Sequence, residues 1–174
     1  MRRHWIWLAA FLCLIAEGSL FPWFIPAALQ EQFLLAPHFV LVIVCYAALY
    51  SNRYLALLIG LVLGMVHDLI YYGHMLGLYA FSMGLTGYLT GLVFSRPLLH
   101  YIYGILIVAA CSIFFDSLIY ALYRLFGVID ESYHWVFLEQ ILPSLAVTLI
   151  FALIVYYPVR QLFVERAQPS KEEI

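Results

Sequence analysis

Charged residues are what this sequence has least of. Only 10% of its 174 residues are Asp, Glu, Lys or Arg, whereas a soluble domain carries about 25%. Hydrophobic residues make up 66% of the chain, and the mean hydropathy is +0.99. This composition excludes an ordinary soluble domain and indicates an integral membrane protein with almost no soluble mass. Because lipid forces each spanning segment to satisfy its own backbone hydrogen bonds, we expect an all-α protein.

The sequence also lacks the signatures of catalysis and of metal binding. Cys13, Cys45 and Cys111 lie singly inside apolar runs, which is typical of small buried side chains rather than of a disulfide framework or a zinc site. There is no HExxH, no GxSxG and no phosphate-binding loop. His67 and Asp68 are adjacent, so on a helix they point about 100° apart and do not easily share a metal. We therefore expect a protein that is not an enzyme, with no cofactor, no metal and no nucleic-acid partner.

Apolar runs separated by turn residues predict six transmembrane helices within a single domain, residues 1–166, followed by a polar tail, residues 167–174. The loop at 21–37 contains three prolines, and we expect it to lie in the membrane interface. A basic start before the first apolar run has the outline of a signal peptide, but we expect this run to remain as the first helix. The predicted helices are Trp5–Leu20, His38–Tyr50, Tyr54–Tyr72, Met75–Phe94, Leu98–Leu125 and Trp135–Val164.

Two of these helices have unusual features. His38–Tyr50 covers only about 20 Å, whereas the hydrocarbon layer is about 30 Å thick. It therefore either starts before Pro37 or is held by its neighbours where the membrane is locally thinned. The last helix contains Pro143 and Pro158, and we expect it to bend near both.

The basic residues predict how the chain is oriented. With six spans, both termini fall on one side of the membrane, and Arg124 is the only basic residue on the other side. Such a bias places both termini in the cytoplasm. The seven basic residues predicted on the cytoplasmic side are Arg2, Arg3, Arg53, Arg96, Arg160, Arg166 and Lys171.

In this topology the acids inside the membrane all fall in the outer half. A carboxylate at this depth is costly, so it is a functional hypothesis by default. Two readings remain open: a polar cavity or partner groove open to the outside, or acids that are simply hydrogen-bonded across helices, which contributes about 0.6 kcal/mol per bond. Polar faces on the last two helices (Ser112 with Asp116, and Gln140, Ser144 and Thr148) extend the pattern. The residues predicted at this level are Glu17, Asp68, Asp116 and Glu139, together with His67 and Arg124.

Small residues line one face of each of two consecutive helices. Gly60 and Gly64 share a face with Asp68 by four-residue spacing. Gly84, Gly87 and Gly91 form a narrow face on the next helix. Such faces allow two helix backbones to approach closely in lipid. The pattern predicts either packing within this hairpin or contact with a partner helix.

In the central segment, Gly60-Leu61-Val62-Leu63-Gly64 leads to Asp68, and Leu76-Gly77-Leu78-Tyr79-Ala80 follows after a short turn. The pattern continues through Met83-Gly84-Leu85-Thr86-Gly87-Tyr88, and the segment from Pro37-His38-Phe39 to Asn52-Arg53 precedes it. These residues resemble the MreD family of bacterial rod-shape-determining proteins. The family supplies no catalytic residues. What it transfers is the motif from Gly64 to Asp68 and the turn at Gly77, for packing or partner contact.

The resemblance implies a fold similar to the substrate-binding subunits of energy-coupling-factor vitamin transporters. It also implies a non-enzymatic scaffold in the bacterial cytoplasmic membrane, regulating cell shape and lateral peptidoglycan synthesis within the elongation machinery. The implied partners are a bitopic MreC-like protein, a RodA-type glycosyltransferase, a class B penicillin-binding protein, the actin-like MreB and membrane lipid. The alternative is a vitamin-type substrate-binding subunit of a transporter, with the outer-half cavity as its binding site.

Overall fold

The computed structural model of the chain describes residues 3–20, 37–71, 75–94 and 101–164, and every regular element in these ranges is helical. The prediction of an all-α protein is therefore confirmed for the described residues. The predicted loop at 21–37, apart from Pro37, and the predicted tail at 167–174 lie outside them. The elements are α1 (Arg3–Ile15) with the π turn η1 (Ala16–Leu20), α4 (Phe39–Tyr50), α5 (Arg53–Ile70), α6 (Leu78–Val93), α7 (Tyr101–Leu125), and α8 (Tyr133–Val136) with the π turn η2 (Phe137–Ile141) and α9 (Leu142–Val164).

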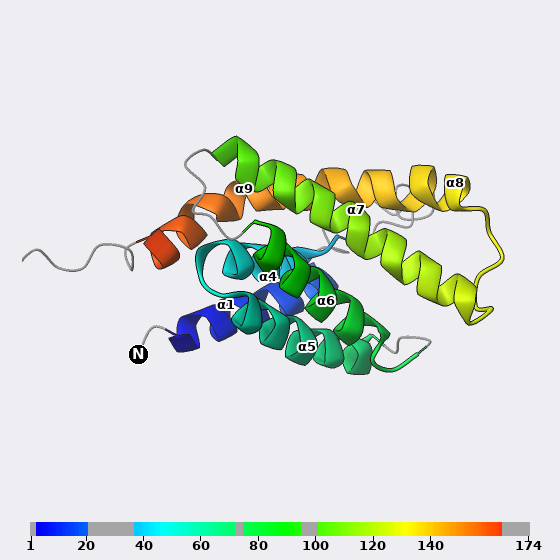
Figure 1. The fold of residues 1–174 in the computed structure, drawn as a ribbon, viewed down its shortest axis with the longest axis horizontal. Coiled ribbons are helices and arrows are strands. Elements are labelled where there is room, and N and C mark those ends of the chain that lie inside the picture. Colours follow the sequence, from blue (N-terminus) through cyan, green and yellow to red (C-terminus); the bar gives the residue numbers. More distant parts are fainter. Residues whose placement is uncertain (1–2, 21–36, 72–74, 95–100, 165–174) are drawn as a thin grey trace, which may run out of the picture.

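Successive helices run back and forth along one direction (Figure 1). The start of α1, the start of α5 and the end of α9 lie at one end, here called the terminal end. The ends of α5 and α7 and the start of α8 lie at the opposite, distal end. Helices α7 and α9 lie beside each other, on one side of the group formed by α1, α4, α5 and α6.

Three helical segments are long and apolar enough to cross a membrane: Arg53–Ile70, Ile102–Leu125 and Tyr133–Val155. Three further apolar helices are shorter: Ala10–Ser19, Phe39–Tyr50 and Leu78–Val93. Regular structure that is helical throughout the described residues, with this many apolar segments, indicates a membrane protein by length and composition.

The short helix α4 is the core of the molecule. All of its residues from Phe39 to Leu49 are buried, and it contacts α1, α5, α6, α7 and α9. Phe39 stacks on Phe151 with ring centroids 4.1 Å apart, and the hydroxyl of Tyr46 donates to the carbonyl of Ala152 at 3.1 Å. Of the two alternatives for this helix, a start before Pro37 is wrong, because α4 starts at Phe39 with its neighbours around it. Local thinning of the membrane at this helix stays a prediction. A helix that is apolar all round is buried all round.

Helices α5 and α6 form a tight hairpin. A Cβ added to Gly64 would lie 2.5 Å from the Cα of Ala80, and one added to Gly60 would lie 2.8 Å from the carbonyl carbon of Met83. Only glycine leaves room for backbones this close. On α6, Gly87 faces Val44 and Ala56, and Gly91 faces Arg53.

The last helical run is irregular at its start. Proline has no N–H, so Pro143 cannot donate to the carbonyl of Glu139, four residues earlier. The five-residue π turn Phe137–Ile141 lies next to this position, as expected where the regular hydrogen-bond ladder is interrupted. A π turn thus accompanies Pro143, and the bends predicted near Pro143 and Pro158 stay predictions.

Candidate functional site

Polar side chains from three helices converge on the start of α4. One carboxylate oxygen of Glu17, in η1, accepts hydrogen bonds from the backbone N–H groups of Phe39 (3.0 Å) and Val40 (3.3 Å). The hydroxyl of Thr148, on α9, accepts from the N–H of His38 at 3.2 Å. These bonds satisfy N–H groups that a helix start leaves without intrahelical partners. A carboxylate here also interacts favourably with the helix dipole.

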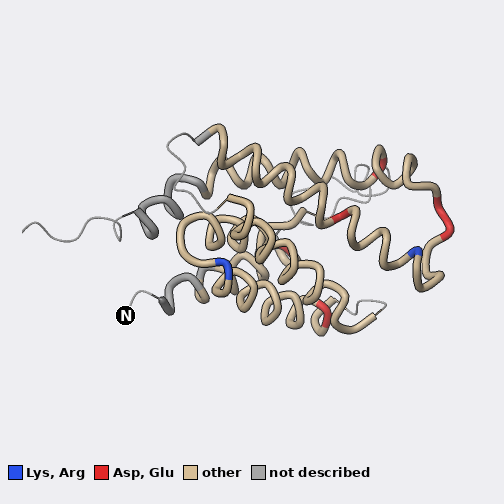
Figure 2. Tube along the Cα trace, viewed as in Figure 1, with Lys and Arg blue, Asp and Glu red and all other residues tan. Residues whose placement is uncertain are grey.

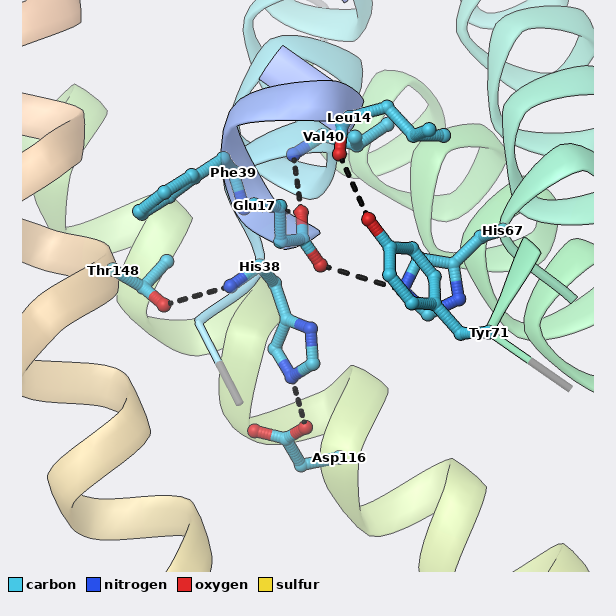
Figure 3. A network of polar contacts seen from close by, with 9 residues as sticks. All are labelled: Leu14, Glu17, His38, Phe39, Val40, His67, Tyr71, Asp116 and Thr148. Carbon is cyan, nitrogen blue, oxygen red and sulfur yellow. Dashed lines mark hydrogen bonds and ion pairs between the residues drawn. The ribbon is translucent and has the colours of Figure 1, made fainter. Parts of the chain in front are cut away.

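Two histidine–carboxylate pairs flank this helix start (Figure 3). Nε2 of His38 lies 2.7 Å from Oδ1 of Asp116, and Nε2 of His67 lies 3.5 Å from Oε1 of Glu17. The His67 ring stacks on Tyr79, with centroids 4.2 Å apart and planes 10° apart. We call Glu17, His38, His67, Asp116 and Thr148 the polar cluster. It joins η1, α4, α5, α7 and α9.

The hydroxyl of Tyr71 supports the same region from the end of α5. It donates to the carbonyl of Leu14 at 3.1 Å (Figure 3). Leu14 lies just before the π turn η1, where the regular carbonyl pattern changes. Gly18 makes room for the Tyr71 ring, because a Cβ at this position would collide with it.

Asp68 contacts the start of α6 rather than the start of α4. Its side chain is buried, and Oδ2 accepts from the N–H groups of Gly77 at 2.9 Å and Ala80 at 3.4 Å. Gly77 is the N-cap of α6 and has φ +90°, a conformation that favours glycine. Asp68 therefore caps α6 across the hairpin turn and does not belong to the polar cluster.

The structure does not bring Arg124 and Glu139 into the cluster. The exposed Arg124 donates from Nη1 to the carbonyls of Asp130 (3.3 Å) and Glu131 (3.0 Å), in the connection between α7 and α8. Glu139 lies in η2, and among the described residues no hydrogen bond or ion pair joins it to the cluster. Of the residues predicted in the outer half, Glu17, His67 and Asp116 thus belong to the polar cluster and Asp68 forms a separate cap. Arg124 and Glu139 lie outside both.

His38 is the residue that sequence reasoning missed. It follows Pro37 at the start of an apolar run and therefore appears only as a helix boundary. The side chain is nevertheless buried and pairs with Asp116, 78 positions away. The available signal was a histidine beside an otherwise unbroken apolar run. Burial of a histidine side chain is costly in free energy unless a partner is present.

A cavity of about 220 Å³ adjoins the polar cluster. It lies among α4, α6, α7 and the α8–η2–α9 run, and reaches Ile129 in the connection before α8. Oδ2 of Asp116 and Nδ1 of His38 are buried and have no hydrogen-bond partner among the described residues. The lining residues are His38, Tyr79, Asp116, Ile119, Tyr120, Tyr123, Ile129, Val136, Gln140, Ile141 and Ser144.

The acids of this region contact helix starts or line the cavity. Among the described residues, no group of three or more His, Cys, Asp or Glu side chains is arranged to hold a metal ion. The carboxylates of Glu17 and Asp68 are engaged with backbone N–H groups of helix starts. The cavity is the place where a small polar molecule would meet buried, unpaired polar atoms.

Comparison with known proteins adds the family. The chain matches the family model described as rod shape-determining protein MreD over residues 1–166. Searches of curated proteins and of solved structures gave no match. A family match over nearly the whole chain, together with an all-helical and strongly apolar fold, identifies this protein as a member of the MreD family of rod shape-determining proteins.

Proposed function

We propose that this protein is a non-enzymatic scaffold subunit of the bacterial cell-elongation machinery, acting in the cytoplasmic membrane. The observation that carries the proposal is the family match over residues 1–166. In this role the chain binds an MreC-like bitopic protein and, with it, the RodA-type glycosyltransferase and the class B penicillin-binding protein. Through them it regulates lateral peptidoglycan synthesis together with the actin-like MreB.

The hydrogen bonds of two buried acids to helix starts support a scaffold role. Glu17 holds the start of α4, and Asp68 holds the start of α6. Both carboxylates thus fix helices in place, which suits a rigid platform for partner helices. Because Gly60, Gly64, Gly84 and Gly91 face the opposite helix of the hairpin, and Gly87 faces Val44 of α4 as well as Ala56 of α5, we assign these five glycines to internal packing rather than to partner contact.

The proposed topology has six spans within one domain, residues 1–166, with both termini in the cytoplasm and a cytoplasmic tail at 167–174. The back-and-forth course of the helices supports it (Figure 1). The described basic residues agree with it as well, since Arg53 starts α5 at the terminal end and Arg124 lies near the distal end of α7 (Figure 2). A fold similar to energy-coupling-factor substrate-binding subunits is part of the same proposal.

The test is purification of the tagged protein from its native membrane in mild detergent, with identification of the proteins that co-purify. We expect the MreC-like protein and at least one wall synthase to be enriched over a preparation from a strain that expresses an unrelated tagged six-span protein. Depletion of the chain should convert rods to spheres, and re-expression should restore them. Rods that persist without the protein, or purification without any elongation protein, would contradict the scaffold role.

The presence of a cavity is the observation behind a second candidate, a small-molecule binding subunit of a vitamin-type transporter. Its volume of about 220 Å³ is below the range of about 300–1,000 Å³ that drug-sized ligands occupy, so the size of the cavity weighs against a whole vitamin as its ligand. A transporter subunit should keep its vitamin through purification, so native mass spectrometry of the purified protein separates the two candidates. A retained vitamin, with no elongation protein bound, would favour the transporter.

A further inference from the structure

We propose that the cavity beside Asp116 binds a small organic cation, through an ammonium or guanidinium group. The site needs only the cavity and its lining, so it is additional to the scaffold role and does not depend on it. Four features of the cavity point to a cation: an incompletely hydrogen-bonded carboxylate, aromatic walls, no basic side chain in the described lining, and the size of the space.

The carboxylate of Asp116 is only half satisfied. Oδ1 pairs with Nε2 of His38 at 2.7 Å, whereas Oδ2 is buried without a hydrogen-bond partner among the described residues. A carboxylate has about four lone-pair sites, so one N–H leaves most of its capacity unused. In a poorly solvated interior an unpaired anionic oxygen is costly. The side chain of Asp116 lines the cavity and is 14% exposed, so a cationic ligand would lie against this carboxylate, and rotation of the carboxylate would turn the buried Oδ2 toward the ligand's donors.

The remaining lining favours a cation over an anion. Tyr79, Tyr120 and Tyr123 line the space, and the faces of aromatic rings attract cations. Gln140 and Ser144 add an amide and a hydroxyl. The described lining contains no Lys or Arg, so an anionic headgroup or a carboxylate ligand would find Asp116 and no fixed positive charge except through His38.

The size of the cavity limits the ligand. About 220 Å³ is too small for a nucleotide or a folded peptide segment, since sites for drug-sized ligands start near 300 Å³. It suits one charged group on a short stem. The same chemistry has two sources, a free small amine or the Lys or Arg side chain of a partner protein.

The first test titrates ethylammonium chloride into the purified protein at constant ionic strength, by calorimetry or ligand-observed NMR. Ethanol serves as the neutral molecule of the same size, and sodium propionate as the anion. We expect saturable binding of ethylammonium and none of ethanol or propionate. Ethanol binding as well as ethylammonium, or no saturable binding of ethylammonium, would overturn the proposal.

Variants locate the binding. Asp116→Asn should lower the ethylammonium affinity at least tenfold, whereas Glu139→Gln, which removes one charge in η2 outside the cavity lining, should leave it unchanged. If Asp116→Asn does not fold, Ile129→Trp takes its place, because it fills the cavity from the connection before α8 and leaves the His38–Asp116 pair intact. Unchanged ethylammonium binding in folded Asp116→Asn or in folded Ile129→Trp would overturn the assignment.

A further arm distinguishes the two sources of the cation. Ethylammonium is titrated into the chain purified alone and into the chain purified with its native partners. Binding to both indicates a site for a free amine. Binding to the isolated chain and not to the complex indicates that a partner's cationic side chain fills the cavity. Either result supports the cation site, whereas binding to neither excludes it.

Discussion

At the scale of single residues, the buried acids act mainly on the backbone. A helix start inside a membrane protein leaves N–H groups that water cannot reach, and each unpaired group is costly. Asp68 accepts from Gly77 and Ala80 at the start of α6, and Glu17 accepts from Phe39 and Val40 at the start of α4. The acids are placed where helix starts are buried, which explains why they occur within apolar runs.

Substitutions at Asp68 separate capping from charge. Asp68→Ala removes the acceptor for Gly77 and Ala80 and should lower the free energy of unfolding by about 1–2 kcal/mol, the usual cost of a lost cap. Asp68→Asn keeps an acceptor oxygen and should lie close to the unsubstituted protein. Thermal and SDS-induced unfolding in detergent measure both.

Cell shape provides the second readout for the same two variants. If Asp68 serves as a cap, the asparagine variant should support normal rods and normal association with the MreC-like protein. An asparagine variant that is stable yet fails in shape and association would show that the negative charge itself is used. The matched control is Glu139→Gln, because the carboxylate of Glu139 accepts no hydrogen bond from a helix start among the described residues.

At the scale of helices, the α5–α6 hairpin depends on which atoms face each glycine. At Gly64 an added Cβ meets the backbone of Ala80 at 2.5 Å, whereas at Gly84 it meets the Cγ of the flexible Leu61 side chain at 2.9 Å. Backbone cannot rotate away, so Gly64→Ala should destabilise the protein by about 1–3 kcal/mol, as overpacking does. Gly84→Ala should cost clearly less, because the Leu61 side chain can move and alanine is the better helix former. Unfolding in detergent ranks the two, and an equal or reversed ranking would contradict this packing.

The helices themselves were largely predictable from the sequence. The predicted helix Leu98–Leu125 ends at the same residue as α7 (Tyr101–Leu125). The predicted helix Met75–Phe94 overlaps α6 (Leu78–Val93) and starts three residues before it. Apolar runs bounded by Pro, Gly and polar turns carry this information locally. The α6 start differs because Gly77, in its left-handed conformation, begins the helix later.

The neighbours of each helix were not predictable in the same way. Depth along a helix follows from residue counting, so Glu17, Asp116, Arg124 and Glu139 could be placed at a common level. The direction in which each side chain points depends on helix order in the bundle, which no local pattern specifies. This is why the pairing of His38 with Asp116 was missed, and why Arg124, which binds its own connection instead, was grouped with the cluster.

At the scale of the whole molecule, the position of the polar cluster and the distribution of basic residues together indicate from which side of the membrane the cavity is reached. The buried start of α4, where the cluster is centred, lies toward the interior rather than at either end, and the cavity extends from it to the connection before α8. With the proposed orientation, this connection faces the outside of the cell. A ligand or partner group would then reach Asp116 from outside, past Ile129.

The orientation can be tested with two single cysteines in a variant that lacks Cys13, Cys45 and Cys111. Asp130→Cys lies in the connection between α7 and α8 at the distal end, and Arg53→Cys lies at the start of α5 at the terminal end. Because basic residues are retained on the cytoplasmic side, a membrane-impermeant maleimide added to intact cells should label Asp130→Cys and not Arg53→Cys. Opening the cells should make Arg53→Cys reactive, which controls for its accessibility. Labelling of Arg53→Cys from outside would reverse the orientation. The connection that carries Ile129 would then face the cytoplasm, where the ligand or partner group would have to originate.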